Sequence, residues 1–474
     1  MNLAKSKDRP IYLGFLILIA WLPLPLGSNR PWAEAIMEIW VCSLMLLWLI
    51  AFMRNRVWIS DAFKKATPVI CLLFVWLLWL LLQIIPLPSA WVASSSPAAF
   101  ELHSLASDGG FMTLSLDLHA TAAGWLKSLA YSLIFILSLL LIHSRRRLRQ
   151  LAYVIIYSGL FQAVYGSLMT LSGLGYGFFI QNPLALNVTT GTFINRNHLA
   201  GYLIMALSVG IGMMIASLNT ESDYTAKQRL RYYLKLILST KLRLRLYLVM
   251  MVIALVLTHS RMGNTAFFAG LMITGGIGLI LSRHATRGTI VLLISLIAID
   301  VFIVGTWFGL EKVVQRIEET TLVKETRDEV DIYVYQQWKD YRWTGSGLGS
   351  FYSVFPKYRK EDVGGFYDHT HNDYLEFASD TGAIGVGLLG FVVVISIYAA
   401  LVAQYRRRDP LMRGISFAAI MSICAMMIHA TVDFNLQIPA NAATFMLILS
   451  MAWISYGFSN KVVKKKTKYK KVYF

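Results

Sequence analysis

Long apolar stretches separated by short polar or basic connections run along almost the whole chain. Most hold roughly twenty residues, the length that a helix needs to cross a hydrocarbon core of about 30 Å. We therefore predict an all-α polytopic membrane protein. The pattern predicts about twelve transmembrane helices, near residues 11–27, 32–53, 66–86, 121–143, 151–172, 198–217, 246–260, 264–282, 288–309, 379–404, 413–432 and 440–458.

The composition agrees with a membrane protein. Hydrophobic residues make up 56% of the chain and charged residues 15%, which excludes an ordinary soluble protein. The first apolar run, Ile11 to Leu26, lacks a small-residue cleavage site, so we expect a retained helix and not a signal peptide. Three cysteines lie inside apolar runs and predict neither a disulfide framework nor a metal site.

The formal net charge of +18 comes from basic clusters that lie between apolar runs. No aromatic and basic recognition module accompanies them, so we expect no nucleic-acid partner. Putting every second connection in the cytoplasm collects all the clusters on one side, as the positive-inside rule requires, and leaves both termini cytoplasmic. The clusters are Lys5–Arg9, Arg54–Lys65, Arg145–Arg149, Lys227–Arg245, Arg283–Arg287, Arg406–Arg413 and Lys461–Lys471.

The connections on the other side are unequal in length, and the longest, residues 310–378, is as long as a small domain. It carries more acidic than basic residues, and its aromatic content is too high for a disordered segment. Residues 330–340 favour a helix, and Gly345, Gly347 and Gly349 predict a turn with positive φ or close backbone approach.

The most polar local segment is Tyr367–Glu376, directly before the tenth predicted span. If the helix begins within it, His371 and Leu375 share one face and the imidazole lies at the outer helix end. A neutral imidazole there is able to take a proton from an attacking hydroxyl. One alternative is a histidine that caps the helix or pairs with Asp373. Another is a zinc site of His369, His371 and Asp373, although this spacing is a weak metal signal.

Two arginines are candidates for binding an anionic group. Arg261 lies in the predicted outer hairpin between the seventh and eighth spans, where its planar guanidinium suits a phosphate at headgroup level. The alternative is an arginine that only reaches the interface. Arg327 lies in the long connection and, by itself, is equally consistent with a surface salt bridge.

Further polar residues lie at predicted outer helix ends. Asn195, Arg196 and Asn197 precede the sixth span and suit sugar or phosphate binding, or else a hydrogen-bonded turn that begins a helix. Asp433 lies at an outer helix end, and Asp300 lies deep in the ninth span, where an acidic residue suggests function or an interhelical hydrogen bond. The sequence has no phosphate-binding loop, dinucleotide fingerprint or paired Asp-x-Asp motif, so we expect no cofactor and no metal.

Four segments together resemble the O-antigen ligase and O-antigen polymerase superfamily of membrane glycosyltransferases. The resemblance covers roughly residues 187–440. Its segments are Gly191–Ala200, the Thr258–Arg261 turn, Arg327 followed by Gly345–Phe351, and His371–Leu375 leading to Gly382.

The resemblance implies a GT-C type enzyme of the bacterial inner membrane with its active site in the periplasm. Such an enzyme moves a glycan from undecaprenyl diphosphate to an acceptor sugar hydroxyl, and lipid A-core is the acceptor of the ligases. It also implies inverting, metal-independent catalysis by His371, Arg261 and Arg327. This chain departs from the pattern in lacking a proline before Gly345 and in having a second histidine, His369. We expect the substrate-binding residues to be Asn195, Arg196, Asn197, His369, Asn372, Asp373 and Asp433.

We divide the chain into four parts. Residues 1–186 hold the first five helices and a periplasmic loop near 87–120, and residues 187–309 hold the next four with the Arg261 hairpin. Residues 310–378 form the large periplasmic loop, and residues 379–474 hold the last three helices and a basic cytoplasmic tail.

The same residues leave other functions open. A polysaccharide polymerase of this superfamily, extending a lipid-linked chain, uses the same donor. A protein O-oligosaccharyltransferase, which is another alternative, uses the same lipid-linked donor. A twelve-helix transporter is a rival from another class, although carriers usually show internal repeats and broken helices at the midplane, and the sequence shows neither. A structural partner in a polysaccharide export complex is a further alternative.

Overall fold

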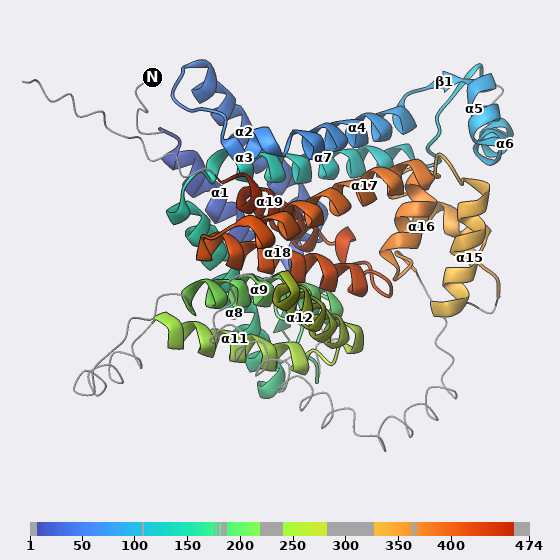
Figure 1. The fold of residues 1–474 in the computed structure, drawn as a ribbon. Helices are drawn as coiled ribbons and strands as arrows, with labels where there is room; N and C mark the ends of the chain where they lie inside the picture. Colours follow the sequence, from blue (N-terminus) through green and yellow to red (C-terminus); the bar gives the residue numbers. More distant parts are fainter. Residues whose placement is uncertain are drawn as a thin grey trace, which may run out of the picture.

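The computed structural model describes residues 7–106, 109–174, 176–177, 180–181, 187–218, 240–281, 327–361, 363 and 367–458. These residues are mostly helical (Figure 1). The longer helices are α1 (Arg9–Trp21), α2 (Pro31–Met53), α4 (Thr67–Ile84), α7 (Leu118–Leu141), α8 (Arg145–Ser172), α9 (Arg196–Leu218), α11 (Thr240–Leu257), α12 (Arg261–Leu281), α15 (Arg327–Asp340), α17 (Asp373–Arg406), α18 (Pro410–His429) and α19 (Pro439–Gly457).

Short elements connect them, and the two antiparallel pairs β1–β2 and β3–β4 are the strands among the described residues. The short elements are η1 (Leu26–Ser28), α3 (Asp61–Lys65), β1 (Leu87–Pro88), α5 (Ser89–Ser95), α6 (Pro97–Ala106), β2 (Phe111–Met112), β3 (Tyr176–Gly177), β4 (Ile180–Gln181), α16 (Phe351–Val354), η3 (Phe355–Lys357) and η4 (Asn435–Gln437).

Nine of the described helices are long and apolar enough to cross a membrane. The prediction of an all-α, multi-pass membrane protein is therefore confirmed, whereas a count of twelve is not. The first predicted span is a helix of 13 residues. α11 has basic residues in its first two turns and is not one of the nine. The predicted ninth span, with Asp300, lies outside the described residues.

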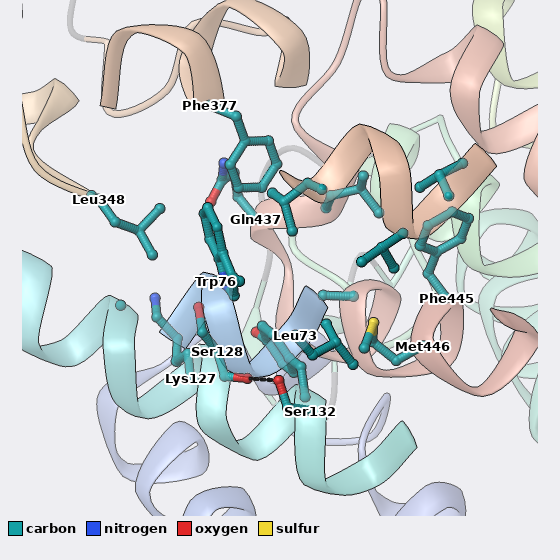
Figure 2. Close-up of a pocket in the computed structure, with 18 of the residues that line it drawn as sticks. Leu73, Trp76, Lys127, Ser128, Ser132, Leu348, Phe377, Gln437, Phe445 and Met446 are labelled. Atoms are coloured by element: carbon teal, nitrogen blue, oxygen red, sulfur yellow. Dashed lines mark hydrogen bonds between the residues drawn. The ribbon is translucent and has the colours of Figure 1, made fainter. Parts of the chain in front are cut away.

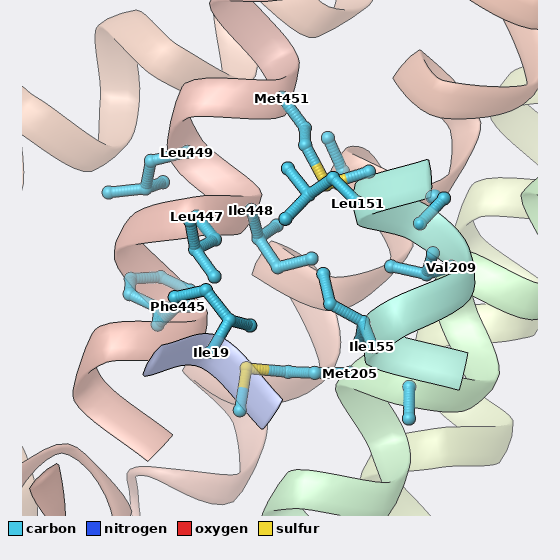
Figure 3. Packing of buried hydrophobic residues seen from close by; sticks show 14 of the residues in the cluster. Ile19, Leu151, Ile155, Met205, Val209, Phe445, Leu447, Ile448, Leu449 and Met451 are labelled. Atoms are coloured by element: carbon cyan, nitrogen blue, oxygen red, sulfur yellow. The ribbon is translucent and has the colours of Figure 1, made fainter. Parts of the chain in front are cut away.

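α9, α18 and α19 lie at the centre of the bundle, and most of their residues are buried. Figure 3 shows α1, α8, α9 and α19 meeting through apolar side chains such as Ile19, Ile155, Met205 and Ile448. α9 and α18 approach closely where Gly212 meets Gly414, since a Cβ on either glycine would lie 2.2 Å from the other's carbonyl oxygen. Such small residues let helix backbones pack tightly in lipid, where no hydrophobic force draws helices together.

Of the seven basic clusters, the four that contain Arg9, Arg56, Arg147 and Arg407 lie near one another at one end of the bundle. Arg283–Arg287, Lys461–Lys471 and most of Lys227–Arg245 lie outside the described residues. Arg147 makes a bidentate ion pair with Asp8, both contacts at 2.7 Å. Arg145 pairs with Asp409 at 2.5 Å, and these contacts join the start of α8 to the N-terminal segment and to the start of α18. α5, α6, α15 and α16 gather at the opposite end, on the right in Figure 1.

The predicted glycine turn joins the elements at this opposite end of the bundle to α17. Gly345, Gly347 and Gly349 all have positive φ, between 72° and 111°, which confirms the predicted turn. The turn packs against an interruption of α17 at Gly382 (φ 69°), where a Cβ would lie 2.1 Å from the carbonyl oxygen of Trp343. The backbone nitrogens of Ser346 and Gly347, like that of Ala383, complete the junction by donating to carbonyls across it, at 2.8–2.9 Å.

Polar side chains satisfy the backbone groups freed at this junction. Gln83 of α4 donates to the carbonyls of Thr344 and Asp380, at 2.7 and 3.1 Å. The Asp380 carboxylate accepts from the Gly349 nitrogen at 2.7 Å. Irregular backbone near a membrane requires such partners. The glycine turn is therefore a fixed joint between the outer elements and the helix that begins after His371.

Candidate active site

A cavity of about 390 Å³ opens at the end of the bundle where α9 and α12 begin and α18 ends. The α11–α12 turn and the segment before α17 complete its wall. Sequence segments that are far apart in the chain thus meet around one space. Its lining residues are Arg196, Asn197, His259, Ser260, Arg261, Met262, Thr265, Asp331, Thr370, His371, His429, Thr431, Val432 and Asp433.

His371 is held by a tight turn that precedes α17. Its φ is 58°, in the left-handed region that a non-glycine residue adopts only when the surroundings impose it. The Thr370 hydroxyl accepts from the Asn372 nitrogen at 3.0 Å and donates to the Asn372 carbonyl at 2.7 Å. Asn372 then caps the helix by accepting from the Leu375 nitrogen. The helix begins two residues after His371, so the predicted shared face of His371 and Leu375 is wrong.

Asp433 lies behind the His371 imidazole. Its Oδ1 is 3.5 Å from His371 Nδ1, and neither atom has another hydrogen-bond partner among the described residues. Its Oδ2 accepts from Asn435 Nδ2 at 2.9 Å and lies 3.8 Å from His429 Nε2. Although 3.5 Å is long for a hydrogen bond, the contact favours the tautomer that keeps its proton on Nδ1 and leaves Nε2 able to accept a proton.

The environment keeps the Asp433 carboxylate charged. Only 1% of its side chain is exposed, and this burial by itself raises its pKa. The contact with His371 and the nearby His198 and His429 imidazoles outweigh burial and lower the pKa of Asp433 to about 2. A charged Asp433 stabilises positive charge that develops on His371.

The ring of Phe434, the residue after Asp433, contacts three imidazoles. His369 stacks on the ring with centroids 4.4 Å apart, and His198 and His371 meet its edge at 4.6 and 4.8 Å. Asn435 and Asn441 hydrogen-bond to each other beneath it, at 2.9 Å. Aromatic contacts of this geometry fix ring orientation, so the His371 side chain is preorganised.

Two guanidinium groups line the same cavity. Arg261 and Arg196 are the first residues of α12 and α9, and both are exposed. Within the described part of the chain, neither lies within 4 Å of a carboxylate. Two helix N-termini also point their backbone N–H groups toward this region, which adds positive potential. The arrangement suits an anion with more than one phosphate.

Some predicted substrate-binding residues have structural partners instead. Asn195 caps α9 by accepting from the Asn197 nitrogen at 2.8 Å, and it does not line the cavity. The Asp373 carboxylate is buried and accepts from the Leu436 nitrogen at 3.1 Å. Asn372 caps α17 and also donates to Asp331 at 3.3 Å. These residues shape the cavity from behind its wall.

His369 forms a separate ion pair. Its Nδ1 lies 2.6 Å from Oε1 of the buried Glu376, whose Oε2 accepts from the Thr370 nitrogen at 3.0 Å. Burial opposes protonation of His369, but the Glu376 carboxylate outweighs it and raises the pKa of His369 above its usual value. His369 does not line the cavity, and its contact with Glu376 ties it to the first turn of α17.

For the remaining predicted residue, Arg327, the structure gives the position in the chain fold. Arg327 is the first residue of α15, four residues before Asp331, which lines the cavity. Three further residues that line the cavity, His259, Asp331 and His429, were not predicted as site residues. His259 was visible only as a neighbour of Arg261, and His429 only by its spacing of four from Asp433. No group of three metal-ligating side chains with suitable geometry occurs among the described residues.

Comparison with known families agrees with the motifs. Residues 246–390 match the family model described as O-antigen ligase. The match includes Arg261, Arg327 and His371 and confirms the resemblance to the O-antigen ligase superfamily. It supports a membrane glycosyltransferase of the O-antigen ligase or polymerase type. No curated protein matches the chain.

Proposed function

We propose that this chain, whose residues 246–390 match the O-antigen ligase family, transfers a glycan from undecaprenyl diphosphate to an acceptor sugar hydroxyl. The observation that carries the proposal is one cavity lined both by the His371–Asp433 pair and by two guanidinium groups. A proton acceptor and a diphosphate site are what this reaction requires.

The proposed step is a direct displacement at the anomeric carbon. The acceptor hydroxyl gives its proton to His371 Nε2 as its oxygen forms the new glycosidic bond. The bond between the anomeric carbon and the phosphate oxygen breaks, and its electron pair leaves with the lipid diphosphate. Attack opposite to the leaving group inverts the anomeric configuration. Asp433 stabilises the imidazolium that forms, which is the role of a buried carboxylate behind a histidine base.

The arginines stabilise the leaving group in this proposal. Negative charge grows on the bridging phosphate oxygen, and Arg261 and Arg196 lie at helix N-termini on the cavity wall. The guanidinium binds phosphate bidentately and does not lose its charge. We expect Arg327 to add a third positive group, because α15 begins four residues before Asp331 of the cavity wall. No metal is needed for this charge balance.

We further propose that the cavity faces the periplasm and that both termini lie in the cytoplasm of a bacterial inner membrane. The basic clusters at the opposite end of the bundle support this orientation. The cavity would then meet lipid-linked glycans in the outer leaflet. A transporter would need a polar path through the bundle, whereas the central helices α9, α18 and α19 are closely packed with apolar side chains.

Our preferred acceptor is lipid A-core, and extension of a lipid-linked polysaccharide is the second candidate. Both reactions use the same donor and the same step at the anomeric carbon. The residues around His371 therefore do not discriminate between them. Transfer to a protein hydroxyl is the third candidate.

The proposal is tested by transfer assays with the purified full-length protein, an undecaprenyl diphosphate-linked glycan, and either lipid A-core or a second donor molecule as acceptor. We expect glycan transfer with release of undecaprenyl diphosphate, and we expect the rate to survive EDTA. The product's anomeric configuration, measured by NMR, should be inverted.

Three outcomes would contradict this proposal or part of it. Absence of transfer to either acceptor, together with uptake of glycan into proteoliposomes, would favour a carrier. Loss of transfer in EDTA with recovery in a divalent cation would overturn the metal-independent mechanism. A retained anomeric configuration would overturn direct displacement.

A further inference from the structure

A second cavity, of about 170 Å³, lies inside the bundle near the active site (Figure 2). Four helices surround it and leave it partly open, because α4 packs against α7, α7 against α19, α19 against α17 and α17 against α4. The segment Asp433–Gln437 joins the two cavities. Asp433 lines the active-site cavity, and Leu436 and Gln437 line the second one.

The second cavity runs along the helices toward the middle of the bundle. Its wall on α7 extends from Ala120 to Ser132, about 18 Å at a rise of about 1.5 Å per residue. Its wall on α19 extends from Ala442 to Leu449, about 10 Å. In a hydrocarbon core of about 30 Å, the cavity therefore reaches from the active-site end to roughly the midplane.

The walls are mostly apolar. Figure 2 shows Leu73, Trp76, Leu348, Phe445 and Met446 around the space. An apolar cavity of about this size, near 150 Å³, stays dry in a protein interior and accepts an apolar ligand. Flexible methionine and flat aromatic side chains also adapt to a chain with many conformations.

The polar groups of the cavity have a distinct arrangement. Gln437 Nε2 is buried and has no hydrogen-bond partner among the described residues. An unpartnered buried amide is costly unless a ligand supplies an acceptor. Lys127 lies 3.6 Å from Glu34 and is only partly exposed. The Ser132 hydroxyl donates to the Ser128 carbonyl at 2.8 Å. The wall thus combines an apolar surface with a free donor beside the active-site segment.

We propose that this cavity binds the hydrocarbon chain of a lipid-linked substrate. The part of the chain next to the polar head lies in the cavity, and the head lies beside Asp433–Gln437. The proposal rests on the proposed glycan transfer and extends it to how a lipid substrate is anchored. The two possible substrates, donor and acceptor, share a long apolar chain attached to an oxygen-rich head. An oxygen of that head accepts a hydrogen bond from Gln437. A prenyl chain would belong to the donor, and an acyl chain to a glycolipid acceptor.

Photoreactive lipids test this site in proteoliposomes of the full-length protein. Three diazirine probes are compared, namely a polyprenyl diphosphate, an acylated glycolipid of the lipid A type and phosphatidylethanolamine. We expect one of the first two to label residues 442–449, found by mass spectrometry, with at least tenfold less labelling by phosphatidylethanolamine. Labelling by polyprenyl diphosphate assigns the site to the donor, and labelling by the glycolipid assigns it to the acceptor.

Filling the cavity provides the matched test. Ser128→Phe should reduce this labelling at least tenfold, and Ala442→Leu, a smaller change on the facing helix, should reduce it several-fold. Gly390→Phe is the control, because Gly390 lies on α17 and a Cβ there meets nothing within 4 Å. It should leave labelling unchanged. Should Ser128→Phe fail to fold, Ala442→Leu by itself decides the question.

The proposal is overturned if neither substrate-type probe labels α19, if phosphatidylethanolamine labels it equally, or if folded cavity-filling variants label as well as the wild type. His371→Ala separates this inference from the proposed function. It should lower the transfer rate roughly 10² to 10⁴ fold and leave labelling of residues 442–449 intact. Labelling by a substrate-type probe without any transfer activity in the wild type would support the lipid site and contradict the enzyme.

Discussion

Asp433 and His371 form the contact on which the chemistry depends, and a substitution at each isolates one role. His371→Ala removes the proton acceptor, so turnover should fall roughly 10² to 10⁴ fold, the usual range for general acid-base catalysis, while donor binding stays nearly normal. Asp433→Asn leaves the imidazole present but without the charge behind it, and should also lower turnover with little effect on donor binding. Turnover and donor binding are measured on the same purified variants.

His369→Ala is the control for this pair, since His369 contacts Phe434 and Glu376 but does not line the cavity. Its effect on turnover should be milder than that of His371→Ala. Loss of donor binding in His371→Ala would mean that the imidazole binds the donor and that its role as a base is wrong.

Arg261 tests whether the site needs geometry as well as charge. Arg261→Lys keeps a positive charge at the start of α12 but replaces the bidentate fork with a single ammonium. We expect the variant to fold and insert, to bind the lipid diphosphate more weakly, and to lose most of its transfer rate. Near-normal turnover in Arg261→Lys would contradict bidentate binding of the diphosphate by this residue.

The sequence predicted the cavity residues His371, Arg261, Arg196, Asn197 and Asp433, but it did not predict that Asp433 lies behind the His371 imidazole. Asn195 and Asn372 resembled ligands because amides suit both sugar binding and helix capping, and in the structure both cap helices. His429 and Asp433 lie four residues apart, a spacing that is common in any helix. Their closeness to His371 depends on tertiary packing, which no local pattern contains.

At the scale of elements, the glycine turn and α17 depend on each other. Gly382→Ala would force a side chain into positive φ and into the Trp343 carbonyl, 2.1 Å from the new Cβ. We expect destabilisation by roughly 3 kcal/mol. Gly390→Ala on the same helix should be neutral or slightly stabilising, because its Cβ meets nothing and alanine favours helix by about 1 kcal/mol. Thermal unfolding of the two detergent-purified variants compares them, and equal melting temperatures would contradict a fixed joint.

The bounds of the helices were predictable where the length of an apolar run defines them, and less so where polar residues lie inside a helix. α2, α4 and α18 begin or end within a few residues of the predicted spans, because apolar length alone defines them. α17 begins six residues before its predicted span. Its first turn carries the buried polar residues Asp373 and Glu376, which a hydropathy pattern assigns to the outer connection. The interruption at Gly382 was also invisible, since it requires the glycine turn as partner.

The orientation of the whole molecule decides whether the cavity meets its proposed substrates. Arg147 lies in the first turn of α8 and Arg407 follows the last residue of α17, whereas Ser95 ends α5 and Glu361 follows η3. α5 and α16 lie at the end of the bundle opposite the start of α8 (Figure 1). Because positive charge is retained on the cytoplasmic side, reporter fusions after Arg147 and Arg407 should report cytoplasm. Fusions after Ser95 and Glu361 should report periplasm. A cytoplasmic signal at Glu361 would put the cavity with nucleotide-linked sugars instead of lipid-linked glycans, and the proposed donor would then be wrong even if His371 and Arg261 proved essential.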